Sequence, residues 1–119
     1  MTLGQKQKQF AQLVPKLIQF IFNNNQSCTL GEAFRTTEQA AIYAQQGKGI
    51  SDSLHCQRLA IDLNLFDANG VYLTDSAAYK SAGQYWKSLD PACEWGGDWG
   101  PTPAHPHQNV DGNHYQLNP

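Results

Sequence analysis

Residues 53–66 have the sequence SLHCQRLAIDLNLF, which is the most informative segment of the chain about its fold. In its second half, residues 60–66, apolar and polar side chains alternate. Alternation with a period of two predicts a half-buried strand with its polar side chains on one face. Asp62 lies on that polar face, where a carboxylate is costly to bury unless a cation or a hydrogen-bond donor satisfies it. The predicted strand therefore carries a candidate functional residue.

His55, in the same stretch, is a second candidate. If the segment were fully extended, His55 and Asp62 would stand up to about 25 Å apart. We therefore expect the chain to bend around Gln57 and Arg58, so that both side chains can reach one site.

An apolar stripe with helical spacing predicts a helix near the N-terminal end. The stripe consists of Phe10, Leu13, Val14, Leu17, Ile18 and Ile21. Pro15 lies inside the stripe, so the helix is either kinked there or begins close to it. Three successive Asn residues, 23–25, end the pattern.

Shorter patterns predict the remaining elements. These are strands at 29–35 and 114–117, a hairpin return at 71–73, loops at 47–51 and 67–70, and helices at 37–46 and 75–89. Leu30 and Phe34 should share one side of the first strand. Thr36 and Gln39 have capping-box spacing before the first of these helices, and Gly47 is a natural end for it. The expected fold class is α+β, with a small antiparallel sheet packed with helices in a single domain, residues 1–119.

Length, charge and hydropathy exclude several classes of protein. The chain has 119 residues and a formal net charge of -2, and it has no run of Lys or Arg. Nucleic-acid binding is therefore not expected. The apolar stretch at 13–22 is too short and too interrupted to span a bilayer and makes a poor signal peptide, so we expect synthesis in the cytoplasm without membrane insertion. Three widely spaced cysteines disfavour a disulfide framework and a Cys-rich zinc finger.

A second polar cluster, DGNHY at residues 111–115, supplies His114. A catalytic zinc takes three protein ligands from His, Asp or Glu and keeps one position open for water or substrate. His55, Asp62 and His114 meet that requirement, and we expect them to bind one Zn²⁺ ion.

Asp111 lies in the same cluster, three residues before His114. The intervening Gly112 and Asn113 tolerate turn geometry, so both side chains can converge on one site. A carboxylate beside the metal but not bound to it could accept the proton of the attacking water and pass it to the leaving amine.

The two segments together resemble the zinc-binding pattern of the M15 peptidases. The match is Ser-x-His-x(4)-Ala-x-Asp at residues 53–62, followed by Asp-x-x-His at 111–114. That family includes D-alanyl-D-alanine carboxypeptidases and dipeptidases, and phage endolysins that cleave between L-alanine and D-glutamate. The short segments EAFRT at 32–36 and EWGGDW at 94–99 look most like those of the compact endolysin branch of the family. The resemblance covers about residues 10–116 and implies the zinc-bound DD-peptidase/hedgehog-like fold.

The resemblance also implies roles for individual residues. The positions that match the family's zinc ligands are His55, Asp62 and His114. Asp111 matches the catalytic carboxylate, and Arg35 matches an arginine that polarises the scissile carbonyl and steadies the oxyanion. Ser53 matches a substrate-contacting serine. Several endolysin relatives have Gln where this chain has Ala40, so the adjacent Gln39, on another side of the helix, is a weaker candidate for that substrate contact.

Plainer interpretations stay open for some of these residues. Arg35 could form a surface ion pair with Glu32 or Glu38. Ser53 could simply cap a turn. Cys56, beside His55, could be a soft ligand, but it suits a small buried residue better.

Other candidates lie in the last third of the chain. His105 or His107 could line a cleft, and His107 could compete with His114 as a ligand. Glu94 and Asp98 are alternatives to Asp111 as the base.

The resemblance implies a zinc metallopeptidase, a hydrolase of peptidoglycan stem peptides, and we expect it to be a monomer. The expected activity is that of an L-alanyl-D-glutamate endopeptidase, serving as a bacteriolytic endolysin of a phage or prophage. After synthesis in the cytoplasm it would reach periplasmic peptidoglycan through a holin pore. The alternatives are a D-alanyl-D-alanine carboxypeptidase and a non-catalytic zinc-containing binding module.

Overall fold

The structure, a computed structural model, describes residues 1–47, 53–104, 106 and 109–119. Within these residues the strands form one four-stranded antiparallel sheet in the order β1-β2-β4-β3. The strands are β1 (Ser27–Leu30), β2 (Ala60–Phe66), β3 (Cys93–Trp95) and β4 (His114–Leu117). The α-helices are α1 (Leu3–Asn23), α2 (Thr37–Gln45) and α3 (Lys80–Leu89), and the short 3₁₀ helices are η1 (Leu54–Gln57), η2 (Ser76–Tyr79) and η3 (Gly96–Asp98). The predicted α+β class is confirmed.

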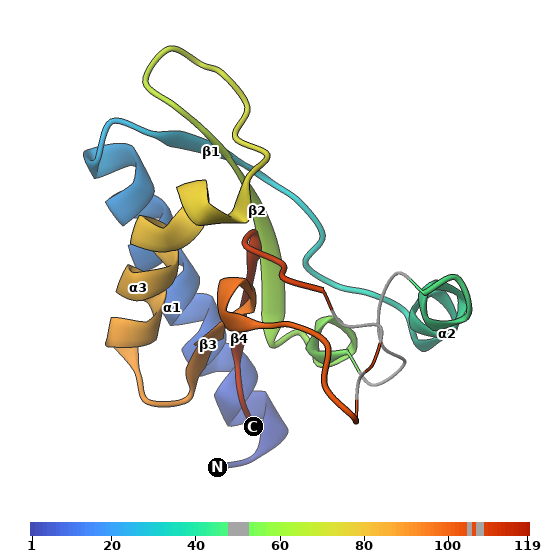
Figure 1. The fold of residues 1–119 in the computed structure, drawn as a ribbon. Coiled ribbons are helices and arrows are strands. Elements are labelled where there is room, and N and C mark those ends of the chain that lie inside the picture. The colour runs from blue at the N-terminus through green and yellow to red at the C-terminus, as the bar shows by residue number, and fades with distance from the viewer. Residues whose placement is uncertain (48–52, 105, 107–108) are drawn as a thin grey trace.

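Helices α1 and α3 lie side by side against the sheet, whereas α2 stands apart from them, on the side of the molecule where η1 lies (Figure 1). The core between the helices and the sheet contains several completely buried side chains. The largest of these are Trp86, Tyr115, Leu17, Ile21, Leu59, Leu63, Leu65 and Leu117. No helix among the described residues is long and apolar enough to cross a membrane.

Helix α1 begins earlier than the position of Pro15 suggested. Thr2 caps it: the Thr2 hydroxyl accepts a hydrogen bond from the backbone N–H of Gln5, and the Gln5 side chain accepts one from the backbone N–H of Thr2. This reciprocal pair stabilises the first turn, so the helix starts at Leu3 and continues through the exposed Pro15. The alternative in which the helix begins at the proline is therefore wrong.

The strand predicted at residues 29–35 is shorter and earlier, since β1 ends at Leu30. Leu30 and Phe34 are 68% and 47% exposed, so they do not form a buried side. The backbone after Leu30 makes two hydrogen bonds with Asp62, through Gly31 and Glu32, and one with His55, whose carbonyl accepts the N–H of Arg35. Regular strand pairing stops because this segment leaves the sheet and runs beside His55 and Asp62, two of the three candidate ligands.

Several other predicted elements are confirmed. Strands β2 and β4 have the predicted bounds, and α2 ends one residue earlier than predicted, before Gly47 in the left-handed region at φ 71°. The helix predicted at 75–89 is divided into η2 and α3. The return at 71–73 is reduced to an isolated bridge between Phe66 and Tyr72. Residues 48–51 of the predicted loop lie outside the described residues.

The sequence patterns missed β3, because three residues are too few to show a period. In the structure β3 is tied to β4 by the Trp86 side chain, whose indole N–H donates to the backbone carbonyls of Glu94 and Gln116. Trp95 of β3 is buried against α3, at the point where the helix has Gly83. An added Cβ on Gly83 would lie 2.1 Å from the Trp95 ring.

This contact predicts an unusual result for a helical glycine. Replacing Gly by Ala in a helix normally stabilises it by about 0.5–1 kcal/mol, but Gly83→Ala should lower the free energy of unfolding by about 1–3 kcal/mol because the methyl group overlaps Trp95. Gly4→Ala in α1 is the matched control, since nothing lies within 4 Å of its added Cβ. Urea unfolding of both variants measures the difference. Equal effects of the two substitutions would contradict the packing described here.

Candidate metal centre

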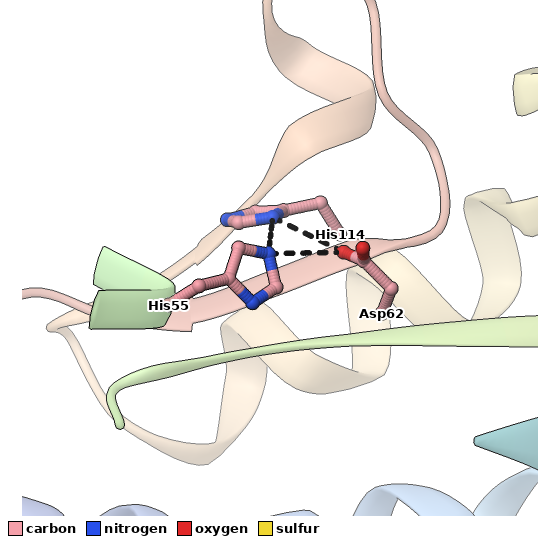
Figure 2. A group of neighbouring side chains, drawn as sticks. All are labelled: His55, Asp62 and His114. Carbon is pink, nitrogen blue, oxygen red and sulfur yellow. Dashed lines mark hydrogen bonds and ion pairs between the residues drawn. The ribbon is translucent and has the colours of Figure 1, made fainter. Parts of the chain in front are cut away.

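The pairing of β2 with β4 places two of the predicted ligands opposite each other. In the antiparallel register Asp62 faces His114 directly. Directly opposed residues have Cβ atoms only about 4.5–5.5 Å apart, so their side chains can share a site. The third residue, His55, comes from η1, and the three side chains point toward one another (Figure 2).

The chain between His55 and β2 turns where the sequence predicted. Arg58, which follows η1, has φ 56° and ψ 36°, in the left-handed region that non-glycine residues rarely adopt. Its backbone N–H donates to the carbonyls of His55 and Leu54, and the Leu59 N–H also donates to Leu54. This tight turn reverses the chain, so that His55 returns over the start of β2.

The candidate ligand atoms are close together. Oδ1 of Asp62 lies 3.3 Å from Nε2 of His55 and 3.3 Å from Nδ1 of His114, and the two nitrogens are 3.1 Å apart. Both imidazoles are buried, with exposed fractions of 2% and 5%. Among the described residues, these three form the one group of His, Cys, Asp or Glu side chains with the spacing needed to hold a metal ion.

The outer nitrogen of each imidazole has a partner that determines where the ring proton lies. Nδ1 of His55 is 3.1 Å from the backbone carbonyl of Ala33, and Nε2 of His114 is 2.8 Å from Oε1 of Gln116. Both partners are oxygen acceptors, so each outer nitrogen carries the proton of the neutral ring. The inner nitrogens of His55 and His114 then present lone pairs to each other and to Asp62.

Three lone pairs directed at one point require a cation. Oδ1 of Asp62 is buried and has no hydrogen-bond donor among the described residues. An aspartate carboxyl group is ordinarily ionised at neutral pH, so Asp62 offers a negatively charged oxygen here. Two neutral imidazoles and one carboxylate are a donor set that suits zinc, so the residues present fit this ion.

Asp111 lies next to this group, in the turn that enters β4, and its backbone carbonyl accepts a hydrogen bond from the N–H of His114. Burial raises the pKa of the Asp111 carboxyl, and the negative charge of Asp62 adds to this, while His114, His55 and Arg35 oppose it. These interactions place the carboxyl group within electrostatic range of all three candidate ligands. A carboxyl group with a raised pKa is suited to take up and release a proton.

Arg35 forms one of the ion pairs considered from the sequence. Its Nε pairs with Glu32, and its guanidinium lies 4.9 Å from the centre of the Tyr43 ring. Its side chain is only 13% exposed, and its charge lowers the pKa of Asp111, so the pair with Glu32 does not remove Arg35 from the site. The two interpretations of Arg35 are therefore compatible.

Ser53 and Gln39, the two predicted substrate contacts, differ from each other in their burial and surroundings. Ser53 is buried, and its Oγ accepts the N–H of His55 at 3.3 Å, so it caps η1. Gln39 is half-buried in the first turn of α2, where its backbone N–H donates to the hydroxyl of Thr36. Ala40, rather than Gln39, is the buried residue of that helix.

The remaining candidates lie outside the group of three. Cys56 is half-buried, and its thiol lies 3.7 Å from the carbonyl of Thr36. The carboxylate of Asp98 pairs at 2.7 Å with Lys87, and that of Glu94 accepts hydrogen bonds from other side chains. His105 and His107 lie outside the described residues.

The family follows from comparison with known proteins. The model of a peptidase family described as D-alanyl-D-alanine carboxypeptidase matches residues 46–117, more than half of the chain. The chain belongs to the M15 peptidase family. M15 peptidases are zinc-dependent hydrolases that act on peptidoglycan, so this M15 peptidase is a zinc-dependent enzyme. No curated protein sequence matches the chain.

Two solved structures share the fold of this M15 peptidase. The L-Ala D-Glu endopeptidase ChiX of Serratia marcescens has a TM-score of 0.66 and 18% identity, with 93% of this chain and 79% of that chain covered. A variant of the vancomycin-resistance D,D-pentapeptidase VanY, in complex with Zn(II), has a TM-score of 0.57 and 16% identity, with coverage of 92% and 70%. The likeness supports the zinc-bound DD-peptidase-like fold expected from the sequence.

Gln116, which contacts His114, was not among the functional residues predicted from the sequence. A signal was present, because residues two apart on a strand point to the same face. The partner of His55 could not be found in this way, since the carbonyl of Ala33 belongs to the backbone and comes from an irregular segment.

The approach of β4 to the centre depends on Gly96 in η3. An added Cβ there would lie 2.2 Å from the backbone oxygen of Asp111 and 2.9 Å from Cβ of His114. We therefore expect Gly96→Ala to displace His114 and to weaken zinc binding at least tenfold, measured by competition with a chromogenic chelator. Gly100→Ala is the control, because nothing lies within 4 Å of its added Cβ. Wild-type zinc affinity in Gly96→Ala would show that this close approach does not position the centre.

Proposed function

We propose that the protein is an L-alanyl-D-glutamate endopeptidase of the peptidoglycan stem peptide, with one zinc ion held by His55, Asp62 and His114. The observation that carries the proposal is the convergence of three lone pairs, within 3.3 Å of one another, on one buried point. The choice of bond is supported by the likeness to ChiX, an L-Ala D-Glu endopeptidase, whose TM-score exceeds that of VanY.

When bound, zinc supplies a Lewis acid that polarises a carbonyl group and acidifies a water molecule. Asp111 is the proposed proton carrier, because it is half-buried, near the ligands and outside the set of three. It would accept the proton of the attacking water and return it to the departing amine. Its raised pKa makes its carboxylate a stronger base than that of an ordinary aspartate, which favours the first of these transfers.

Arg35 is the proposed stabiliser of the oxyanion. The contact with Glu32 uses its Nε, and the ring of Tyr43 lies under the guanidinium, so the orientation of the group is held from two sides. The hydrogen bond to Glu32 is made by Nε, and the terminal nitrogens are the atoms that we propose for the contact with the substrate. Ser53 and Gln39 remain proposed substrate contacts, and Ser53 would combine this role with capping η1.

A D-alanyl-D-alanine carboxypeptidase is the second candidate, because the description of the matching family model favours it. One digest distinguishes the two. Purified peptidoglycan is incubated with the zinc-loaded protein, with and without chelator, and the products are analysed by mass spectrometry. New peptides with N-terminal D-glutamate, absent with chelator, are the expected result. Release of terminal D-alanine would support the carboxypeptidase instead, and intact peptidoglycan would overturn both.

We further propose that the enzyme is an endolysin that is made in the cytoplasm and reaches periplasmic peptidoglycan through a holin pore. The added protein should then lyse Gram-negative-type cells whose outer membrane has been permeabilised, and chelator should prevent this. Digestion of isolated peptidoglycan without any lysis of such cells would contradict the endolysin role and leave the peptidase activity intact.

Measuring zinc content and catalytic activity separately in each variant tests the roles of individual residues. Asp111→Asn should lower kcat/KM by about 100- to 10,000-fold, because proton transfer is lost, while one zinc ion still binds. His114→Ala should lose both zinc and activity. Asp98→Asn is the matched control, since that carboxylate pairs with Lys87 on the surface and should be dispensable. Near-normal activity of Asp111→Asn would remove Asp111 from the mechanism.

A further inference from the structure

The two candidate histidine ligands are oriented by different kinds of partner. His55 donates its Nδ1–H to the backbone carbonyl of Ala33, which can only accept. His114 instead lies 2.8 Å from the side-chain amide of Gln116, and an amide can present either an oxygen acceptor or an NH₂ donor. The proton position on His114 therefore depends on which end of Gln116 faces it.

Glu94 decides the orientation of that amide. Nε2 of Gln116 lies 3.2 Å from Oε2 of Glu94, and it also donates to Oδ1 of Asn118 at 2.7 Å. An ionised carboxylate can only accept hydrogen bonds, so the NH₂ end of Gln116 must face Glu94. Its oxygen end is then left for Nε2–H of His114, and Nδ1 of His114 keeps its lone pair.

Glu94 is itself held by donors. Its Oε2 accepts the indole N–H of Trp99 at 2.9 Å, and its Oε1 accepts the side-chain amide of Asn118 at 3.4 Å. The indole nitrogen of tryptophan can only donate, so it requires an acceptor at Glu94. The same Trp99 ring lies 4.6 Å from the His114 ring, between ring centres, and covers it. Glu94 thus fixes both the hydrogen-bond partner of His114 and the ring packed on it.

We propose that Glu94 and Gln116 are positioning residues that hold His114 in the tautomer with its Nδ1 lone pair directed at the metal position. The proposal rests on the proposed function in one respect, since it takes His114 as a zinc ligand. It assigns Glu94 a role different from that of a base, because its carboxylate is occupied by three donors and acts on the centre through Gln116. Partners of this kind commonly change metal affinity by about 10- to 100-fold.

The first test measures the tautomer without metal. In zinc-free wild-type protein, at a pH where the imidazole is neutral, the ¹⁵N NMR shifts of His114 should report a larger fraction of the Nε2–H form than in either of two variants. Gln116→Leu removes the acceptor, and Glu94→Gln allows the Gln116 amide to turn over. Both variants should populate the Nδ1–H form. A pure Nε2–H form in both variants would overturn the proposal.

The second test measures zinc affinity in the same proteins. We expect Gln116→Leu and Glu94→Gln to bind zinc about 10- to 100-fold more weakly. The exchange variant Glu94→Gln/Gln116→Glu restores an acceptor next to His114 and a donor–acceptor pair between residues 94 and 116, so it should recover most of the affinity. Failure of the exchange to recover any affinity, in a folded protein, would contradict the tautomer mechanism.

A matched control separates this effect from a general loss of structure. Gln9 is also half-buried and also bonds to a carboxylate, that of Asp90 at 2.9 Å, but it lies on α1. Gln9→Leu should leave both the His114 tautomer and the zinc affinity unchanged. If His114→Ala leaves zinc affinity intact, the proposed metal site fails. If His114→Ala abolishes binding while Gln116→Leu does not weaken it, only the present inference fails.

Discussion

The antiparallel pairing of β2 with β4 is the constraint on which the centre depends. The register sets Asp62 opposite His114, and a shift by one residue would move one of them to the other face of the sheet. Buried apolar residues hold this register: Leu63 and Leu65 of β2 and Tyr115 and Leu117 of β4 have an exposed fraction of 0%. The energy that places two charged or polar side chains at the site therefore comes from apolar side chains on the opposite face of the same strands.

Two positions with unusual backbone requirements bring the surrounding chain close to this pair. Gly96 allows the segment that carries Asp111 to come close, and the left-handed Arg58 returns η1 toward β2. The irregular segment after β1 makes backbone hydrogen bonds with Asp62 of β2 and with the carbonyl of His55 in η1. Because these contacts are made by backbone atoms, the geometry of the site is tied to the path of the chain and not only to side-chain packing. Such anchoring suits a centre that must keep three donors aligned.

The sequence predicted the parts of the fold that have a clear period or a recognisable spacing. Strand β2 was found because Ile61, Leu63 and Leu65 alternate with polar residues, and the candidate ligands were found because of their family pattern. Strand β3 was missed because three residues show no period, and the strand at 29–35 was predicted too long because Leu30 and Phe34 look like a buried pair but are exposed. The orientation of His114 by Gln116 and Glu94 was out of reach, since it depends on β3 lying beside β4.

The inner lone pairs of His55, Asp62 and His114 should together bind one zinc ion. The most direct measurement is a crystal structure of the zinc-loaded protein with anomalous diffraction recorded at the zinc edge. We expect one strong anomalous peak at about 2.0–2.2 Å from Nε2 of His55, Oδ1 of Asp62 and Nδ1 of His114. A fully occupied zinc ion bound elsewhere, for example to the thiolate of Cys56 or without His114, would contradict it.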